Sequence, residues 1–164
     1  MTGNDKPAGD IVIRPATAAD RDFLSSLNDR LIANVSVAGV SRADLQRFQG
    51  RYTTAALDGE KPGGETLVAV DTSGVSLGYA HLRPDEDFLT GEPAGYVSIL
   101  VVGDDATGRG VGGKLLDAAE DWAAAHGYKT LQLDVFASND PARRFYARRG
   151  FEEESLRLRR KLGD

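Results

Sequence analysis

The stretch ATGRGVGGKLL, residues 106–116, holds four glycines within six consecutive positions. Gly108, Gly110 and Gly113 fit the dinucleotide-binding pattern G-x-G-x-x-G. Gly108, Gly113 and Lys114 fit most of the P-loop pattern G-x-x-x-x-G-K. Glycines let a backbone approach a ligand closely, and free N–H groups at a helix start favour anions. The stretch therefore predicts a phosphate-binding loop; the alternative is a turn that only lets a helix pack against a strand.

The neighbouring residues weigh against both nucleotide patterns. A P-loop needs Ser or Thr after its lysine to hold magnesium, and here Leu115 follows. For a dinucleotide site, Asp134 lies about 20 residues further on, where the ribose-binding acid is expected. However, GDDAT separates the preceding strand from Gly108, and too little chain follows to build a doubly wound sheet.

Composition limits the class of protein. The 164 residues suit one domain, and the net charge of −5 argues against nucleic-acid binding. There is no cysteine and there are only two histidines, so we expect no disulfide, thiol nucleophile or metal site. No apolar run approaches a membrane span, and the polar first ten residues are unlike a signal peptide. We predict a cytoplasmic protein with a flexible tail at 1–10, a single domain at 11–164 and no membrane partner.

Periodicity predicts the order of elements. Helices are expected around 17–31, 43–56, 111–126 and 141–149. Strands are expected at 11–14, 65–71, 76–84, 96–102, 130–136 and 151–162. In the last strand, leucines alternate with basic residues, and the strand at 96–102 is apolar enough to be covered on both faces. The order predicts a single mixed α/β domain.

Two segments, LVVGDDATGRGVGGKLL (100–116) and LQLDVFASNDPARRFYARRGF (131–151), together resemble the GNAT superfamily of acetyl-CoA-dependent N-acetyltransferases. In the first, Gly110 and Gly112 occupy the two glycine positions of the family's Arg/Gln-x-x-Gly-x-Gly/Ala loop. In the second, the family's Asn-x-x-Ala-x-x-x-Tyr and Gly-Phe positions are filled by Asn139, Ala142, Tyr146, Gly150 and Phe151. The opening IVIRPATAADRDFL also looks like the family's first strand and helix.

The resemblance implies a fold and a cofactor. The fold is a mostly antiparallel α+β sheet flanked by helices, with a splayed parallel pair formed by the strands of Leu100 and Leu133. Acetyl-CoA would enter that gap, with its pyrophosphate on the amides of the glycine loop and its pantetheine arm along the preceding strand. The residues implied to bind it are Leu100, Val101, Val102, Thr107, Gly108, Arg109, Gly110, Val111, Gly112, Gly113, Asn139, Arg143 and Tyr146.

The resemblance also implies that the Tyr146 hydroxyl protonates the departing thiolate, and that Asn139 hydrogen-bonds the cofactor. A phenol suits this role because its ordinary pKa of about 10 keeps it protonated at neutral pH. The alternatives are a core tyrosine beside Phe145 and an asparagine that only caps the helix before Pro141.

The sequence departs from the family at two places. Thr107 stands where the loop begins with Arg or Gln, so Arg109, Lys114 or Arg143 would have to supply the phosphate partner. Many relatives carry Glu on the strand before the loop, but YVSILVV (96–102) contains no carboxylate. An alkylammonium must lose a proton before it attacks. We therefore expect a water relay through the Ser98 hydroxyl and strand carbonyls, helped by Glu92, Asp134 or Tyr96.

The predicted function is transfer of an acetyl group from acetyl-CoA to a primary amine by direct attack in a ternary complex. No cysteine is available as a nucleophile, and no serine has a convincing base. The alternative is a non-catalytic acyl-CoA sensor with the same fold. The acceptor is expected to be an amine on a small molecule or a protein, and an acidic loop at 85–92 would suit a cation. Pairing through edge strands suggests a homodimer.

Overall fold

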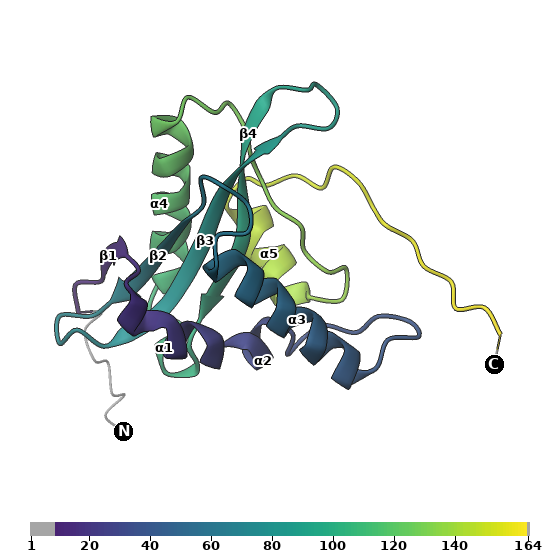
Figure 1. Ribbon diagram of the computed structural model, residues 1–164, viewed down its shortest axis with the longest axis horizontal. Helices are drawn as coiled ribbons and strands as arrows, with labels where there is room; N and C mark the ends of the chain where they lie inside the picture. Colours follow the sequence, from purple (N-terminus) through teal and green to yellow (C-terminus); the bar gives the residue numbers. More distant parts are fainter. Residues whose placement is uncertain (1–8, 164) are drawn as a thin grey trace.

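The computed structural model describes residues 9–163, so residues 1–8 of the expected tail lie outside the described part. One sheet runs through it in the order β1-β2-β3-β4-β5 (Figure 1). Its neighbours are antiparallel, except that β4 and β5 are parallel. This confirms the mixed, mostly antiparallel sheet. The strands are β1 (Val12–Pro15), β2 (Glu65–Val70), β3 (Ser76–Glu86), β4 (Pro93–Val102) and β5 (Leu131–Gln132).

Helices cover both faces of the sheet. Alternate residues of β2 point to opposite faces, so Leu67 packs with α4 (Val111–Ala125) and Val68 packs with α1 (Arg21–Ser26). The α4 face also holds α5 (Asp140–Arg148). The α1 face also holds α3 (Arg42–Leu57). The remaining elements are short: η1 (Ala18–Asp20), α2 (Asn28–Leu31) and η2 (Asp104–Ala106). The elements alternate as the sequence predicts.

The α4 helix packs one face firmly against the core. Its apolar positions recur at helical spacing, and Leu115, Leu116 and Ala119 have no exposed surface. Trp122 is buried with them, which confirms its expected place in the core. Gly127 ends the helix with a φ of 76°, in the left-handed region that a helix C-terminus commonly uses.

β4 contains a bulge opposite β3 and diverges from β5. His81 pairs with Ile99 and Leu82 pairs with Val97, which leaves Ser98 as an extra residue in β4. The parallel ladder to β5 covers only Gly95 with Leu131 and Tyr96 with Gln132. Beyond Tyr96 the two strands separate, which confirms the splayed parallel pair. The edge of β4 that faces this gap has no strand partner among the described residues.

Two expected strands differ from the structure. The strand expected at 130–136 is shortened to β5, because beyond Gln132 the neighbouring β4 no longer lies within hydrogen-bonding reach. The strand expected at 151–162 is wrong: residues 152–163 belong to no strand of the described chain. They extend away from the domain (Figure 1), with Leu156, Leu158 and Leu162 exposed. Alternation alone cannot make a strand, because a strand needs an edge to pair with.

Among residues 9–163, no helix has the length and apolar character needed to cross a lipid bilayer.

Candidate active site

The loop between β4 and α4 depends on two glycines. Gly108 has a φ of 80° and Gly110 a φ of 76°, in the left-handed region that other residues adopt only with strain. Gly110 is the N-cap residue of α4, and no side chain caps this helix. By contrast, the Ser41 hydroxyl caps α3 by accepting from the Asp44 N–H at 3.1 Å. The start of α4 is therefore left open.

The next two glycines are not required by packing. A Cβ at Gly112 would lie 3.5 Å from Phe145 and 3.6 Å from Val102, which are ordinary contacts. A Cβ at Gly113 would lie 3.5 Å from the Arg149 guanidinium. The missing side chains leave the N–H groups of the first turn accessible, and these groups have no acceptor within the helix. With the positive end of the helix dipole, this cradle fits a diphosphate.

The loop is held from the opposite side of the sheet by Arg30 of α2. Its guanidinium donates to the Val102 carbonyl and the Asp104 carboxylate, and to the Thr107 hydroxyl at 2.9 Å. The ion pair offsets one of the two acidic charges beside the loop. The sequence analysis missed Arg30, because more than 70 residues separate it from these partners and no local pattern marks it. Thr107 is thus a structural contact of the loop as well as a candidate cofactor residue.

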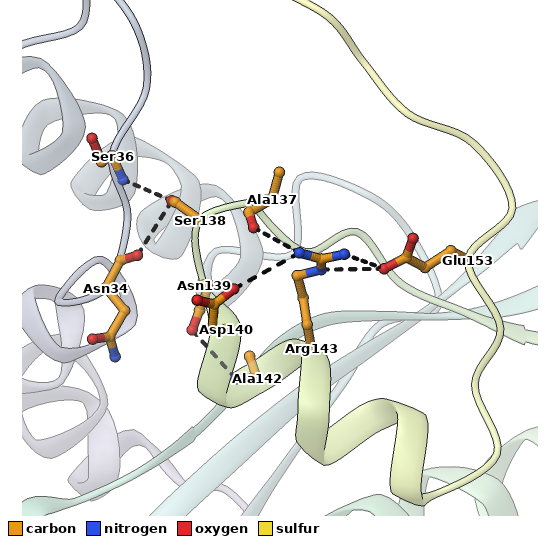
Figure 2. A network of polar contacts seen from close by, with 9 residues as sticks. All are labelled: Asn34, Ser36, Ala137, Ser138, Asn139, Asp140, Ala142, Arg143 and Glu153. Carbon is orange, nitrogen blue, oxygen red and sulfur yellow. Dashed lines mark hydrogen bonds and ion pairs between the residues drawn. The ribbon is translucent and has the colours of Figure 1, made fainter.

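The candidate phosphate partners differ in availability. Arg143 forms an ion pair with Glu153 at 2.5 Å and donates to the Ala137 carbonyl at 3.1 Å (Figure 2). Arg109 and Lys114 form no ion pair with any described residue. Arg109 and Lys114 are therefore better placed than Arg143 to meet an added anion.

Beyond the divergence, β4 provides the strand on which a pantetheine arm is expected. Leu100 and Val102 pack against the core on the α4 face, and Val101 is buried on the α1 face. Val111, the first residue of α4, is also buried, at 1% exposure. The side chains of Val101 and Val111 are thus fixed in the core. Leu100 and Val102 are only partly buried, so a ligand can meet their side chains as well as their main-chain groups.

Tyr146 lies on α5 between two aromatic rings. Its ring centroid is 5.2 Å from that of Phe145 and 5.6 Å from that of Phe151, in edge-on arrangements. It packs against the same core cluster as Leu100 and Leu133, the residues on either side of the gap. Burial raises the pKa of the phenol to about 12, so it holds its proton at neutral pH.

Asn139 caps α5, as one of its two interpretations predicts. Its side-chain oxygen accepts from the Ala142 N–H at 3.4 Å (Figure 2). Its neighbour Ser138 accepts from the Ser36 N–H at 2.8 Å and donates to the Asn34 carbonyl at 3.3 Å. The loop after α2 is thereby tied to the start of α5.

Tyr96 and Asp134 bridge the mouth of the gap. The Tyr96 hydroxyl donates to the Asp134 carboxylate, and the Arg83 guanidinium carbon lies 4.2 Å from the centroid of the Tyr96 ring. Burial, and then the hydrogen bond to Asp134, raise the pKa of Tyr96 above its ordinary value. Ser98 lies two residues further along β4, and its buried hydroxyl has no hydrogen-bond partner among the described residues. Such a group is a place for a water or a ligand.

Three aromatic side chains cluster on the α3 side of the gap, and no sequence motif predicts this cluster. Phe48 and Tyr52 are one helical turn apart on α3, with ring centroids 5.7 Å apart. Phe136 meets Phe48 edge-on at 6.3 Å.

Glu92 lies elsewhere. It lines a depression of about 340 Å³ with His126 and Tyr128, at the C-terminal end of α4. Of the three proton-relay helpers expected from the sequence, Asp134 and Tyr96 are therefore at the gap and Glu92 is not.

In the described residues, the sheet opens between two parallel strands beside an uncapped, glycine-lined helix start. Residues 36–151 match the model of the Acetyltransferase (GNAT) family, and the chain belongs to that family.

Similar sequences and solved structures also include acetyltransferases. The chain is 30% identical to an uncharacterized N-acetyltransferase of Bacillus subtilis, YhfO, over 69% of this chain and 73% of that one. It is 32% identical to an L-methionine sulfoximine/L-methionine sulfone acetyltransferase of Pseudomonas aeruginosa, over 85% and 79%. A putative acetyl transferase from Pyrococcus furiosus has a similar structure, with a TM-score of 0.77, 21% identity, and coverage of 93% of this chain and 100% of that one.

Proposed function

We propose that this protein transfers an acetyl group from acetyl-CoA to a primary amine, by direct attack within a ternary complex. The divergence of β4 from β5, with the open start of α4 at one end and Asp134 at the other, is the observation that carries the proposal. Between a diphosphate cradle and a carboxylate, it leaves main-chain groups of β4 without a strand partner, although the Val102 carbonyl accepts from Arg30. The named acetylation activity of a relative at 32% identity supports an amine as the acceptor.

The chain's own groups divide the binding of acetyl-CoA among them. The N–H groups from Gly108 to Gly113 hold the diphosphate, with Arg109 and Lys114 adding positive charge. The free edge of β4 around Leu100 and Val102 pairs with the amides of the pantetheine, as an added strand would. When bound, acetyl-CoA supplies a thioester carbonyl that is open to attack by an amine. Main-chain N–H groups of β4 at the gap polarise that carbonyl.

In the transfer step, the neutral amine nitrogen forms a bond to the carbonyl carbon and the bond from that carbon to sulfur breaks. The Tyr146 hydroxyl gives its proton to the departing sulfur, which leaves as a thiol. Before the attack, the substrate ammonium gives one proton to the Asp134 carboxylate, directly or through water at the Ser98 hydroxyl. As the nitrogen becomes an amide it gives up a second proton, which passes through water to the Tyr146 phenolate and restores the hydroxyl. Tyr96 is a positioning residue, because its hydroxyl holds Asp134 at the mouth of the gap.

Thiol release from acetyl-CoA, measured over a panel of amines, tests this function directly. The chain contains no cysteine, so a thiol reagent detects only the CoA produced. Tyr146→Phe is expected to lower kcat by about 10²-fold or more, because a proton donor is lost, while the Kd for CoA stays unchanged. Tyr128→Phe is the matched control, since Tyr128 stacks on His126 at the far end of α4.

Two results would contradict the proposal. An unchanged kcat in Tyr146→Phe would remove Tyr146 from the reaction. Binding of CoA without acetylation of any amine in the panel would favour the non-catalytic sensor, whose case rests on Thr107 and on the absence of a carboxylate from the 96–102 stretch of β4.

A further inference from the structure

The aromatic cluster on the α3 side of the gap is only partly covered by the fold. Phe48 and Tyr52 of α3 pack against each other, and Phe136, in the segment after β5, meets Phe48 edge-on. Phe48 and Phe136 are each 39% exposed, so part of both rings remains open to solvent. Sites for small molecules are typically lined by aromatic side chains with a few placed polar groups. The cluster therefore favours a ligand with an apolar part.

A carboxylate lies beside these rings. Asp134 comes two residues before Phe136 and accepts from the Tyr96 hydroxyl. After burial and this hydrogen bond, the charge of the nearby Tyr52 further raises the pKa of Tyr96, so the α3 cluster is close to the two groups at the mouth of the gap. Two residues span at most about 7 Å of chain. One small molecule can therefore meet the Asp134 carboxylate and the Phe136 ring together.

The charge of Asp134 is not balanced by a basic side chain, because it forms no ion pair with any described residue. Arg83 contacts the Tyr96 ring, but its guanidinium is bound to other groups. It pairs with Asp85 at 3.3 Å and donates to the Pro84 carbonyl, and its side chain is only 13% exposed. Asp134 is therefore free to pair with a cation on a ligand.

The basic residues of α3 next to the rings are also engaged elsewhere. Arg47 pairs with Asp44 on its own helix, and Arg51 lines a separate depression with Asp58 and Glu60. Among the groups described above, this side of the gap thus offers a ligand one negative charge and no unpaired positive charge. An ammonium fits such a place, whereas a carboxylate on the same ligand would lie beside Asp134 without a counter-ion.

We propose that the acceptor is a primary amine joined to an aromatic ring through one or two carbons, and that it carries no carboxylate. This inference rests on the proposed acetyl transfer and names its substrate class. The ammonium pairs with Asp134, and the ring packs against Phe48 and Phe136. Free amino acids are disfavoured by their carboxylate. Linear diamines are disfavoured because their second ammonium would lose water against the rings without a partner.

The first experiment measures binding without turnover. Calorimetry gives the Kd of three amines for the protein in the presence of CoA, which has no acetyl group to transfer. 2-Phenylethylamine is expected to bind at least about tenfold more tightly than L-phenylalanine, which differs from it only by a carboxylate. It is also expected to bind at least about tenfold more tightly than 1,4-diaminobutane, which has no ring. Similar or weaker binding of 2-phenylethylamine in either comparison would overturn the proposal.

The second experiment assigns the preference to the rings. Phe48→Ala and Phe136→Ala are each expected to lower the ratio of kcat/KM for 2-phenylethylamine to kcat/KM for ethylamine by about tenfold, because ethylamine has no ring to lose contact. Phe88→Ala is the matched control and keeps the ratio, since Phe88 is 72% exposed in the loop between β3 and β4. Phe48→Tyr keeps a ring and should also keep the ratio. Circular dichroism verifies the fold of each variant.

The outcomes separate this inference from the proposed transfer. An unchanged ratio in both alanine variants would overturn the role of the rings. A higher kcat/KM for 1,4-diaminobutane or L-phenylalanine than for 2-phenylethylamine would uphold the transfer and overturn the substrate class. Tight binding of 2-phenylethylamine without acetylation of any amine would do the reverse: it would support recognition of an aromatic amine and refute the transfer.

Discussion

The start of α4 and residues 152–163, here called the arm, are alike in one respect: each presents groups that the rest of the described chain leaves without partners. At α4 the unmet groups are main-chain N–H donors in a turn lined by glycines. On the arm they are alternating leucines together with a free strand backbone. Donors at a helix start favour a small anion, whereas an alternating strand needs another strand. The type of unpaired group therefore indicates the type of partner: an anion for the N–H donors of α4, and a strand for the alternating leucines of the arm.

The two regions differ in how firmly the fold holds them. The α4 start is anchored by Arg30 on one side and by Leu115 in the core behind it. Residues 152–163 are held by the Glu153 ion pair and by the contact of Lys161 with Gly39, and they pair with no strand among the described residues. The start of α4 is therefore held by the core, and the arm by contacts at the surface. Three measurements test this contrast.

The largest effect is expected from equal truncations of a leucine in each region. Leu115→Ala removes a side chain with no exposed surface and should lower the free energy of unfolding by about 2–5 kcal/mol. In dilute protein, Leu158→Ala should change it by no more than about 0.5 kcal/mol, because that side chain is 89% exposed. Urea unfolding in dilute protein measures both. An equally large cost for both variants in dilute protein would mean that the arm packs on its own domain.

A smaller effect is expected at the cradle. Gly112→Val should raise the Kd for CoA at least about tenfold, or 1.4 kcal/mol, because the side chain covers the N–H groups of the first turn. The Cβ of the new side chain meets only ordinary contacts, and thermal unfolding verifies that the variant stays folded. Gly50→Val makes the same change on α3, where nothing lies within 4 Å of the added atom, and should leave Kd unaltered. Equal Kd values for the two variants, by calorimetry, would mean that the glycine-lined turn serves packing alone.

The smallest effect is expected at the start of η1, where side chains do cap the helix. The Asp20 carboxylate accepts from the Arg14 guanidinium and from the Thr17 N–H at 2.7 Å, and these hydrogen bonds lower its pKa to about 2. Because the folded pKa lies below the ordinary 3.8, this contribution is complete above about pH 4. It is lost as pH falls from there toward 2. Asp20→Asn should cost about 1 kcal/mol at pH 7. Thermal unfolding should show that this cost shrinks below pH 4, and a constant difference would exclude Asp20 as its source.

Local patterns predicted most of the fold. The residue patterns of 65–71, 76–84 and 111–126 predicted β2, β3 and α4, because each pattern lies within its own element. The capping role of Asn139 was also visible, since a cap and its helix are adjacent in the chain. The prediction of a strand at 151–162 failed because a strand also needs a partner strand, which the local pattern does not specify.

The candidate site was less accessible to prediction. The glycine loop, Tyr146 and Asp134 could be found, because a motif or a strand position marks each of them. Arg30 and the Phe48–Phe136 contact could not be found, because they join elements from opposite ends of the chain. The separation of β4 from β5 was expected from the resemblance, but the place where it begins, beyond Tyr96, required the ladder itself.

Local sequence was enough to predict the helices, the strands up to β4, the turns between them and a glycine-lined helix start, because each depends on residues within a few positions of one another. Tertiary structure alone decided which carboxylate stands at the gap, which arginine holds the loop, and that the final leucines lie uncovered. Those outcomes depend on distances between segments far apart in the chain, and such distances are fixed only when the whole core packs.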